Sequence, residues 1–199
     1  MGVKVRNQRG QEREGQAKAL TVTEEIAVYA KAKEGRHAKR DVCMLDFSFR
    51  AGLRAKEIAA LMIEDVTDAK GNVVESFHLS TNQAKGDTGG EVRLGKRLRA
   101  SIKAYLEERA DDNNRHLFKS QGGGFNANTI QQRFATLYKR AEIKGASSHS
   151  GRRTFATRLC KKGLDLKSIS VMMRHKNIST TARYIEADPT KLARAAEDL

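Results

Sequence analysis

The sequence predicts a mainly α-helical domain that carries a small three-stranded antiparallel β-sheet, which is an α+β fold. Three observations support this prediction. Apolar residues recur at helical spacing along most of the chain, only one proline occurs in 199 residues, and the helical period gives way to short extended runs between residues 65 and 94. With 39% hydrophobic residues, the chain is able to form one domain with its own core.

The predicted helices follow one another along the chain. Residues 1–19 are polar and mixed in charge, which is typical of a flexible tail or linker. The folded domain, residues 20–188, begins with a helix at Thr21, because Thr21 and Glu24 have the spacing of a capping box. Further helices are predicted at residues 39–50, 54–64, 96–110, 128–142, 150–162 and 165–173, with a short helix around Tyr184 and an amphipathic tail helix over residues 189–199.

The β-sheet is predicted from the segment between residues 65 and 94. Valine, phenylalanine and leucine residues fall there in short extended runs. Glycine, asparagine and aspartate interrupt these runs at residues 70–72 and 86–90, where turns are expected. The segment therefore predicts three short antiparallel strands.

The charge balance points to a polyanionic partner. The chain holds 38 Lys and Arg residues against 24 Asp and Glu residues, a formal net charge of +14. A folded surface with this excess attracts polyanions, because binding releases their counterions. Nucleic acid is therefore the expected partner.

No metal, cofactor or membrane is expected. Cys43 and Cys160 stand apart without the spacing of a zinc site, so they are predicted to be small buried residues in a reducing cytoplasm. No apolar run approaches the length of a membrane span, and the N-terminus is polar where a signal peptide would be apolar. The predicted location is the cytoplasm, with the protein on nucleoid DNA when it is bound.

Two arginines each begin a predicted helix at the head of an apolar stripe. Arg54 precedes Glu57 by three residues, and His149 precedes Arg152 by three residues on the same helical face. One interpretation is that Arg54 and Glu57 form an ordinary ion pair at a solvated helix start. The other is that Glu57 orients a guanidinium that grips two phosphate oxygens, so that Arg54 and Arg152 together clamp one phosphate.

A lysine lies in the second expected turn. Lys85 is followed by glycines that allow a tight turn between strands. A lysine in a hairpin turn is most often simply solvated, but such a turn also can bring its ammonium group against a leaving oxygen.

The four tyrosines fall into two groups. Tyr29, Tyr105 and Tyr138 lie among apolar residues at helical spacing and are predicted to be in the core. Tyr184 has threonine, alanine and aspartate neighbours at helical spacing, and the local apolar stripe runs past it. Its phenol is therefore predicted to be presented at the surface, either as an ordinary surface group or as a nucleophile.

Taken in order, these residues resemble the catalytic domain of the tyrosine recombinases, the phage integrase family. The resemblance runs from about Leu20 to Tyr184 and implies the tyrosine recombinase catalytic fold. In two places the chain departs from the family pattern: Ser150-Gly151 replaces a common Asp-Leu, and Arg174 replaces a common glycine. The matching segments are Ala51-Gly52-Leu53-Arg54-Ala55-Lys56-Glu57-Ile58, Lys85, His149-Ser150-Gly151-Arg152-Arg153-Thr154-Phe155-Ala156-Thr157, Arg174-His175 and Thr180-Thr181-Ala182-Arg183-Tyr184.

The resemblance implies site-specific cleavage and rejoining of DNA, without ATP or a catalytic metal. Tyr184 would attack the scissile phosphate and form a 3′-phosphotyrosyl link, and a 5′-hydroxyl would later attack that link. The implied roles of the other residues are charge neutralisation by Arg54 and Arg152, hydrogen bonding and proton transfer by His149 and His175, and protonation of the leaving oxygen by Lys85.

The resemblance also implies partners. They are double-stranded DNA, further copies of the chain in a tetramer on DNA, and, for some members, an accessory DNA-bending protein. The tail helix of residues 189–199 either packs on its own domain or docks on a neighbouring protomer. Full-length members of the family commonly carry an N-terminal helical domain that closes a clamp around DNA, whereas only about twenty polar residues precede the catalytic domain here. Three interpretations are open: a naturally short member, a fragment, or a chain whose partner supplies the other half of the clamp.

Two alternative functions stay open on the sequence. A type IB topoisomerase uses similar chemistry and rejoins the same strand. A non-catalytic DNA-binding regulator built on the same fold would bind DNA without forming a covalent adduct.

Overall fold

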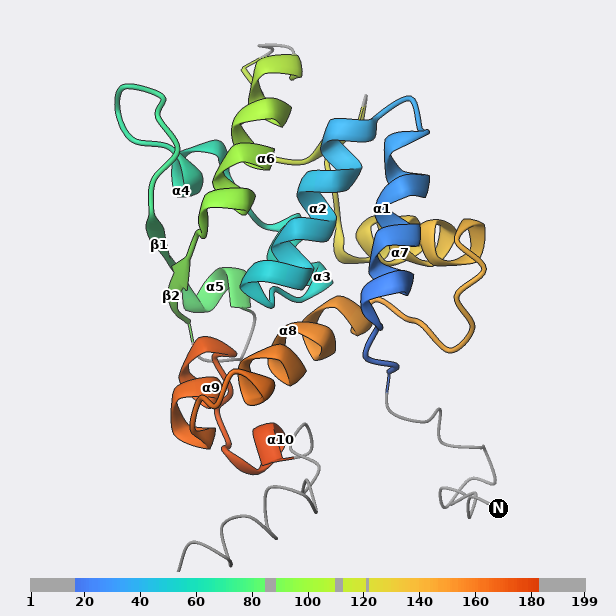
Figure 1. Ribbon diagram of the computed structural model, residues 1–199. Coiled ribbons are helices and arrows are strands. Elements are labelled where there is room, and N and C mark those ends of the chain that lie inside the picture. The colour runs from blue at the N-terminus through green and yellow to red at the C-terminus, as the bar shows by residue number, and fades with distance from the viewer. Residues whose placement is uncertain (1–16, 85–88, 110–112, 121, 183–199) are drawn as a thin grey trace, which may run out of the picture.

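The computed structural model describes residues 17–84, 89–109, 113–120 and 122–182 (Figure 1). The described part is mainly helical with short antiparallel strands, so the predicted class is confirmed. The strands are β1 (Ser76–Leu79), β2 (Gly90–Arg93), β3 (Lys119–Ser120) and β4 (Gly123–Gly124). The helices are α1 (Val22–Lys33), α2 (Ala38–Ala51), α3 (Ala55–Ala59), α4 (Ile63–Val66), α5 (Thr81–Ala84), α6 (Lys96–Glu108), α7 (Ala127–Arg140), α8 (Ser150–Lys161), α9 (Leu166–Met172) and α10 (Ser179–Ala182).

Helix α2 forms the centre of the fold (Figure 1). It packs against α1, α6 and α8, so residues 43–49 are buried without interruption. A helix that is apolar on several sides is stable only in such surroundings. The C-terminal end of α2 therefore leads the chain from the middle of the core directly to the segment that contains Arg54.

A second, smaller apolar cluster joins α8 to α9 and meets the main core at Gly52. Gly52 ends α2 in the left-handed region with φ +64°. A Cβ at this position would lie 2.6 Å from the ring of Phe155 and 3.2 Å from Sδ of Met173. Only glycine allows this turn and this close approach together. The buried residues of the second cluster are Phe155, Ala156, Leu159, Ile169 and Met173.

Several details of the predicted helices are confirmed. Thr21 caps α1: its hydroxyl accepts the Glu24 backbone N–H at 3.2 Å, and the Glu24 carboxylate accepts the Thr21 backbone N–H at 3.0 Å. Tyr29, Tyr105 and Tyr138 are all buried, as predicted. Cys43 is buried, whereas Cys160 is only half-buried at the edge of the second cluster.

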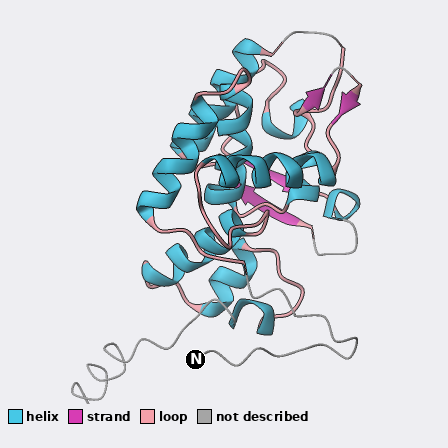
Figure 2. Cartoon of the chain, turned by 90° about the vertical axis from the view of Figure 1, so that its right-hand side faces the viewer, coloured by secondary structure: helices cyan, strands magenta, loops and turns pink. Residues whose placement is uncertain are grey.

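The predicted three-stranded sheet is wrong in its strand count. In the described residues β1 pairs with β2 and β3 pairs with β4, and Figure 2 shows these as two separate pairs of short arrows. The expected third strand is reduced to an isolated bridge between Thr67 and Val73, because Asp68 holds a tight turn by accepting the Asn72 backbone N–H at 2.8 Å. Val66 instead ends helix α4.

The helix predicted at residues 54–64 is divided into α3 and α4. Between them the backbone of Leu61 and Ile63 pairs with a distant segment: Leu61 O accepts the Leu117 N–H at 2.8 Å, and the Ile63 N–H donates to Arg115 O at 2.9 Å. This pairing takes backbone groups that a continuous helix would use itself.

The ends of the chain are described only in part. Residues 1–16 and 183–199 lie outside the described residues, and with them the short helix predicted around Tyr184 and the tail helix of residues 189–199. Ala17 and Lys18 are bonded to the domain, since Ala17 O accepts from Arg153 at 2.9 Å and the Lys18 N–H donates to Gly145 O at 3.3 Å. Ordered contacts thus begin before residue 20. None of the described helices has the length and apolar character needed to cross a bilayer.

Candidate active site

Glu57 lies at the centre of a buried cluster of arginines. Its carboxylate accepts the backbone N–H of Arg54 at 2.8 Å and a guanidinium N–H of the same residue at 2.6 Å. The Glu57 side chain is 1% exposed and that of Arg54 is 18% exposed. The predicted Arg54–Glu57 pair is therefore present, and it is a mostly buried pair at the start of α3.

Arg152 reaches the same carboxylate from α8. Its side chain is 3% exposed, and Nη1 lies 3.9 Å from Oε2 of Glu57. Its two terminal nitrogens donate to the backbone oxygens of Gly52 and Met173. Arg54 and Arg152, about a hundred residues apart in sequence, thus meet at one place in the fold.

A third arginine completes the cluster. Arg174, just after α9, places Nη2 3.3 Å from Oε2 of Glu57, and its side chain is 2% exposed. Three guanidinium groups against one carboxylate give this cluster a charge of +2 (3 − 1). Burial alone would raise the pKa of Glu57, but the surrounding arginines outweigh burial and hold that pKa below its usual value. The cluster is therefore a buried cationic site suited to an anion.

His149 is the N-cap residue of α8, three residues before Arg152. The residue is exposed to solvent, yet partial burial of its ring and then the positive charges of Arg152 and Arg54 lower the pKa of His149 below its usual value. A neutral imidazole beside two guanidinium groups is able to accept a proton at neutral pH.

His175 follows Arg174 and is held by α10. Its Nδ1 lies 2.6 Å from Oγ1 of Thr181, which is fully buried. This hydrogen bond fixes the orientation of the ring. Sequence reasoning did not assign a role to Thr181, although its position six residues after His175 in a Thr-Thr pair was a usable signal.

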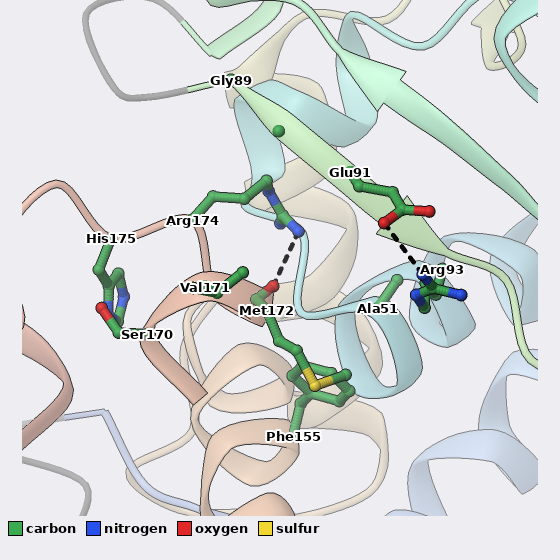
Figure 3. A pocket seen from close by; sticks show the side chains of 11 residues that line it. Ala51, Gly89, Glu91, Arg93, Phe155, Ser170, Val171, Met172, Arg174 and His175 are labelled. Atoms are coloured by element: carbon green, nitrogen blue, oxygen red, sulfur yellow. Dashed lines mark hydrogen bonds and ion pairs between the residues drawn. The ribbon is translucent and has the colours of Figure 1, made fainter. Parts of the chain in front are cut away.

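A cavity of about 340 Å³ opens beside the cluster, between α9 and the start of β2 (Figure 3). Gly89, Gly90, Arg174 and His175 are among the residues that line it. In Figure 3 the side chain of Arg174 extends among the lining residues towards Met172. The cavity is wide enough for a small polar group.

Two predicted site residues, Lys85 and Tyr184, lie outside the described residues. The ends that flank Lys85 are described: Ala84 is buried, and Gly89 lines the cavity. Among the described residues, no three His, Cys, Asp or Glu side chains gather closely enough to hold a metal ion.

The remaining tyrosines are unsuited to nucleophilic chemistry. Burial, and then the Asp46 carboxylate that accepts its hydroxyl at 2.6 Å, strongly raise the pKa of Tyr29. Burial raises the pKa of Tyr105 to about 12 and also raises the pKa of Tyr138. A phenol in such surroundings is hard to ionise and out of reach of a large substrate.

Comparison with known proteins gives the family. A model of the "Phage integrase family" matches residues 18–191. The chain belongs to the phage integrase family. The XerC tyrosine recombinase of Pelobacter propionicus is 29% identical over 163 residues, which cover 80% of this chain and 52% of that protein. The XerA tyrosine recombinase of Pyrococcus horikoshii is 30% identical over 162 residues, covering 79% of this chain and 54% of that protein. This member of the family thus spans about half the length of these relatives.

Solved structures have the same fold as this integrase-family chain. A crystal structure of XerA recombinase superposes with a TM-score of 0.74 at 24% identity and covers 90% of this chain and 64% of that one. The XerH site-specific recombinase bound to its difH substrate superposes with a TM-score of 0.70 at 19% identity, covering 96% of this chain and 58% of that one. The described residues therefore have the tyrosine recombinase catalytic fold.

Proposed function

We propose that this integrase-family chain cleaves and rejoins DNA strands at specific sites through a 3′-phosphotyrosyl intermediate. The observation that carries the proposal is the cluster around Glu57. Guanidinium groups from α3, α8 and the end of α9 converge on it, and two histidines lie beside it. Such a site suits a phosphodiester whose negative charge grows in the transition state.

The proposed reaction is a transesterification at phosphorus. The Tyr184 oxygen forms a bond to the phosphorus, the bond to the 5′-oxygen breaks, and the proton of the phenol passes to a base. His149 is suited to this role because its lowered pKa keeps the imidazole neutral and free to take up a proton. Lys85 protonates the leaving 5′-oxygen. Arg54 and Arg152 bind the non-bridging oxygens, and His175 donates a hydrogen bond to one of them. The reverse attack by a 5′-hydroxyl of another strand completes the exchange.

The assignment of Tyr184 as the nucleophile rests on elimination and on sequence order. The three other tyrosines are buried in the core. His175, nine residues before Tyr184, is placed at the cavity by α9 and α10. Helix α10, the last described element before Tyr184, therefore lies at the edge of the site.

The proposed partners follow from charge and family. The net charge of +14 favours double-stranded DNA, and strand exchange between two duplexes calls for several copies of the chain on DNA, as in a tetramer. The XerH structure named above holds a DNA substrate of that protein. We propose that the present chain acts on nucleoid DNA in the cytoplasm, with residues 20–188 as the catalytic domain.

Covalent trapping tests the proposal. The protein is incubated with nicked suicide duplexes drawn from the DNA that flanks its gene, and adducts that resist SDS are counted. We expect an adduct with the wild type and none with Tyr184→Phe. Tyr105→Phe is the matched control, because it removes a phenol oxygen from the core and should keep the adduct.

The outcomes separate the candidate functions. A wild type that binds these duplexes tightly yet forms no adduct would support a DNA-binding regulator. An adduct that forms on any duplex and is rejoined only to its own strand would support a topoisomerase. An adduct that persists in Tyr184→Phe would exclude Tyr184 as the nucleophile.

A further inference from the structure

Arg174 occupies a backbone position that favours glycine. It has φ +52°, in the left-handed region, directly after α9. Its N–H donates to Val171 O at 2.9 Å, and the N–H of His175 donates to Ser170 O at 3.1 Å. These two bonds form a Schellman motif, in which the left-handed residue is usually glycine because a Cβ is unfavourable there. The chain places one of its largest side chains at this position.

The side chain of Arg174 also carries costs of its own. It is 2% exposed, and burial lowers the pKa of Arg174 below its usual value. Its Nε is buried and makes no hydrogen bond within the described part of the chain. A residue chosen for stability alone would avoid a left-handed backbone, a buried charge and an unsatisfied donor together, and such outliers gather at functional sites.

Arg174 is connected to both Arg54 and Arg152, the two arginines of the proposed site. Its guanidinium binds Oε2 of Glu57, and the other oxygen of that carboxylate holds Arg54. The left-handed turn at Arg174 also presents the preceding carbonyl, Met173 O, which accepts a hydrogen bond from Arg152. The side chain thus acts on one arginine and the backbone on the other.

Arg174 also connects the site to strand β2. A Cβ at Gly90 would lie 3.3 Å from Cγ of Arg174, so the aliphatic part of the arginine packs closely on the backbone of this strand. The nitrogen Nη1 donates to Met172 O at 3.0 Å and ties the guanidinium to α9 (Figure 3). The side chain therefore links α9, β2 and Glu57.

We propose that Arg174 is a positioning residue, whose guanidinium fixes the Glu57 carboxylate and whose left-handed turn presents the Met173 carbonyl, so that Arg54 and Arg152 stay aimed at one phosphate. This inference rests on the proposed function for its chemistry and on the cluster geometry for its structure. Small errors in the placement of charge-stabilising groups lower reaction rates strongly. The role of Arg174 is therefore to set the geometry of the two arginines that bind the phosphate.

The test uses the full chain with Arg174→Gly, which suits the left-handed backbone and removes the guanidinium. Adduct formation is measured in single turnover on two suicide duplexes, one with an ordinary scissile phosphate and one with a neutral methylphosphonate there. On the phosphate duplex we expect a loss on the order of 10- to 100-fold. On the methylphosphonate duplex we expect a much smaller loss, because less charge needs to be neutralised.

A merely structural role predicts a different pattern. Arg174→Gly would then lower both rates by the same factor, and that result would overturn the proposal. Arg174→Lys keeps the positive charge but loses the planar guanidinium with its several donors. It should therefore also lose more rate on the phosphate duplex than on the methylphosphonate duplex. This variant replaces Arg174→Gly in the test if the glycine variant does not fold. Arg115→Ala is the matched control, because Arg115 is 74% exposed in its pair with Glu64 and is not among the residues that line the cavity, so it should leave the ratio of the two rates unchanged.

A second measurement separates this proposal from the proposed function. The melting temperature is measured against inorganic phosphate, which needs no DNA site. If the wild type forms no adduct, the proposed function fails, and the phosphate titration alone then tests whether Arg174 positions the other two arginines. A gain in melting temperature that is lost in Arg174→Gly and kept in Arg115→Ala supports the proposal, and an equal gain, or no gain, in wild type and Arg174→Gly overturns it.

Discussion

Replacing Glu57 by glutamine removes the carboxylate that three arginine side chains face. The substitution keeps the volume of the side chain and one carbonyl oxygen, so it isolates the negative charge. Arg152 and Arg174 would keep their charges at 3% and 2% exposure, and Arg54 at 18%. The charge of this buried cluster would rise from +2 to +3 with no compensating anion.

The expected loss of stability is large. Removing one partner of a buried ion pair costs about 3–5 kcal/mol. Since glutamine still accepts one hydrogen bond and Arg54 is partly solvated, the lower end, about 3 kcal/mol, applies. For a chain of 199 residues, each kcal/mol shifts the melting temperature by about 2–4 °C, so Glu57→Gln should melt roughly 6–12 °C below the wild type.

Urea denaturation followed by circular dichroism measures this loss. The midpoint should fall while the slope with denaturant stays constant, which indicates a change in stability alone. Glu64→Gln is the matched control, since Glu64 is 57% exposed in its pair with Arg115 and should give no resolvable change. If Glu57→Gln proves as stable as the wild type, the carboxylate does not hold the arginines in place and the account of the site is wrong.

Three further predictions concern the same region. Gly151→Ala should destabilise by about 1–3 kcal/mol, because the new Cβ would lie 2.3 Å from Oγ of Ser48, whereas Gly95→Ala, with open space around it, should fold normally in the same melts. Saturating inorganic phosphate should raise the pKa of His149 in an NMR titration, because the anion offsets the nearby guanidinium charges; an unchanged pKa would place the anion elsewhere. The stability that the Glu57 carboxylate contributes should be complete above its ordinary pKa of 4.5 and be lost as the pH falls through the lower pKa of the folded state. The unfolding free energies of wild type and Glu57→Gln should therefore become similar in acid. A difference between them that stays constant down to about pH 3 would contradict the lowered pKa of Glu57.

Much of the helical framework could be predicted from local pattern. The capping box at Thr21 and the apolar stripes of the longer helices are local signals, and they correctly give the helices that form the core. The burial of three tyrosines could be read in the same way. These features depend on residues within one or two helical turns of each other.

The features that the sequence did not predict depend on distant contacts. The division between α3 and α4 arises from pairing with residues 115–117, which no local pattern reveals. The expected third strand became a bridge because the turn at Asp68 closes too early. The β3–β4 hairpin of two-residue strands is too short to produce an alternating pattern.

The sequence predicted individual residues of the candidate site better than it predicted which residues contact one another. The sequence singled out Arg54, Glu57 and Arg152, and the structure brings these three residues together. It did not reveal that Arg174 joins them, because a residue after a helix end has no periodic signal that says where its side chain goes. Nor did it show that Gly151 is required by the side chain of Ser48, which is contributed by α2.

Arg152 fastens the architecture as well as facing the proposed substrate. It donates to the carbonyl of Gly52 at the end of α2 and to the carbonyl of Met173 at the end of α9, so one side chain on α8 joins three separate segments of the chain. Substituting Arg152 is therefore a poor way to obtain an inactive variant for structural or binding studies, because the substitution would weaken the fold as well as the chemistry. Removing a single oxygen by Tyr184→Phe leaves every described tie intact and is the better choice for capturing the protein on uncut DNA.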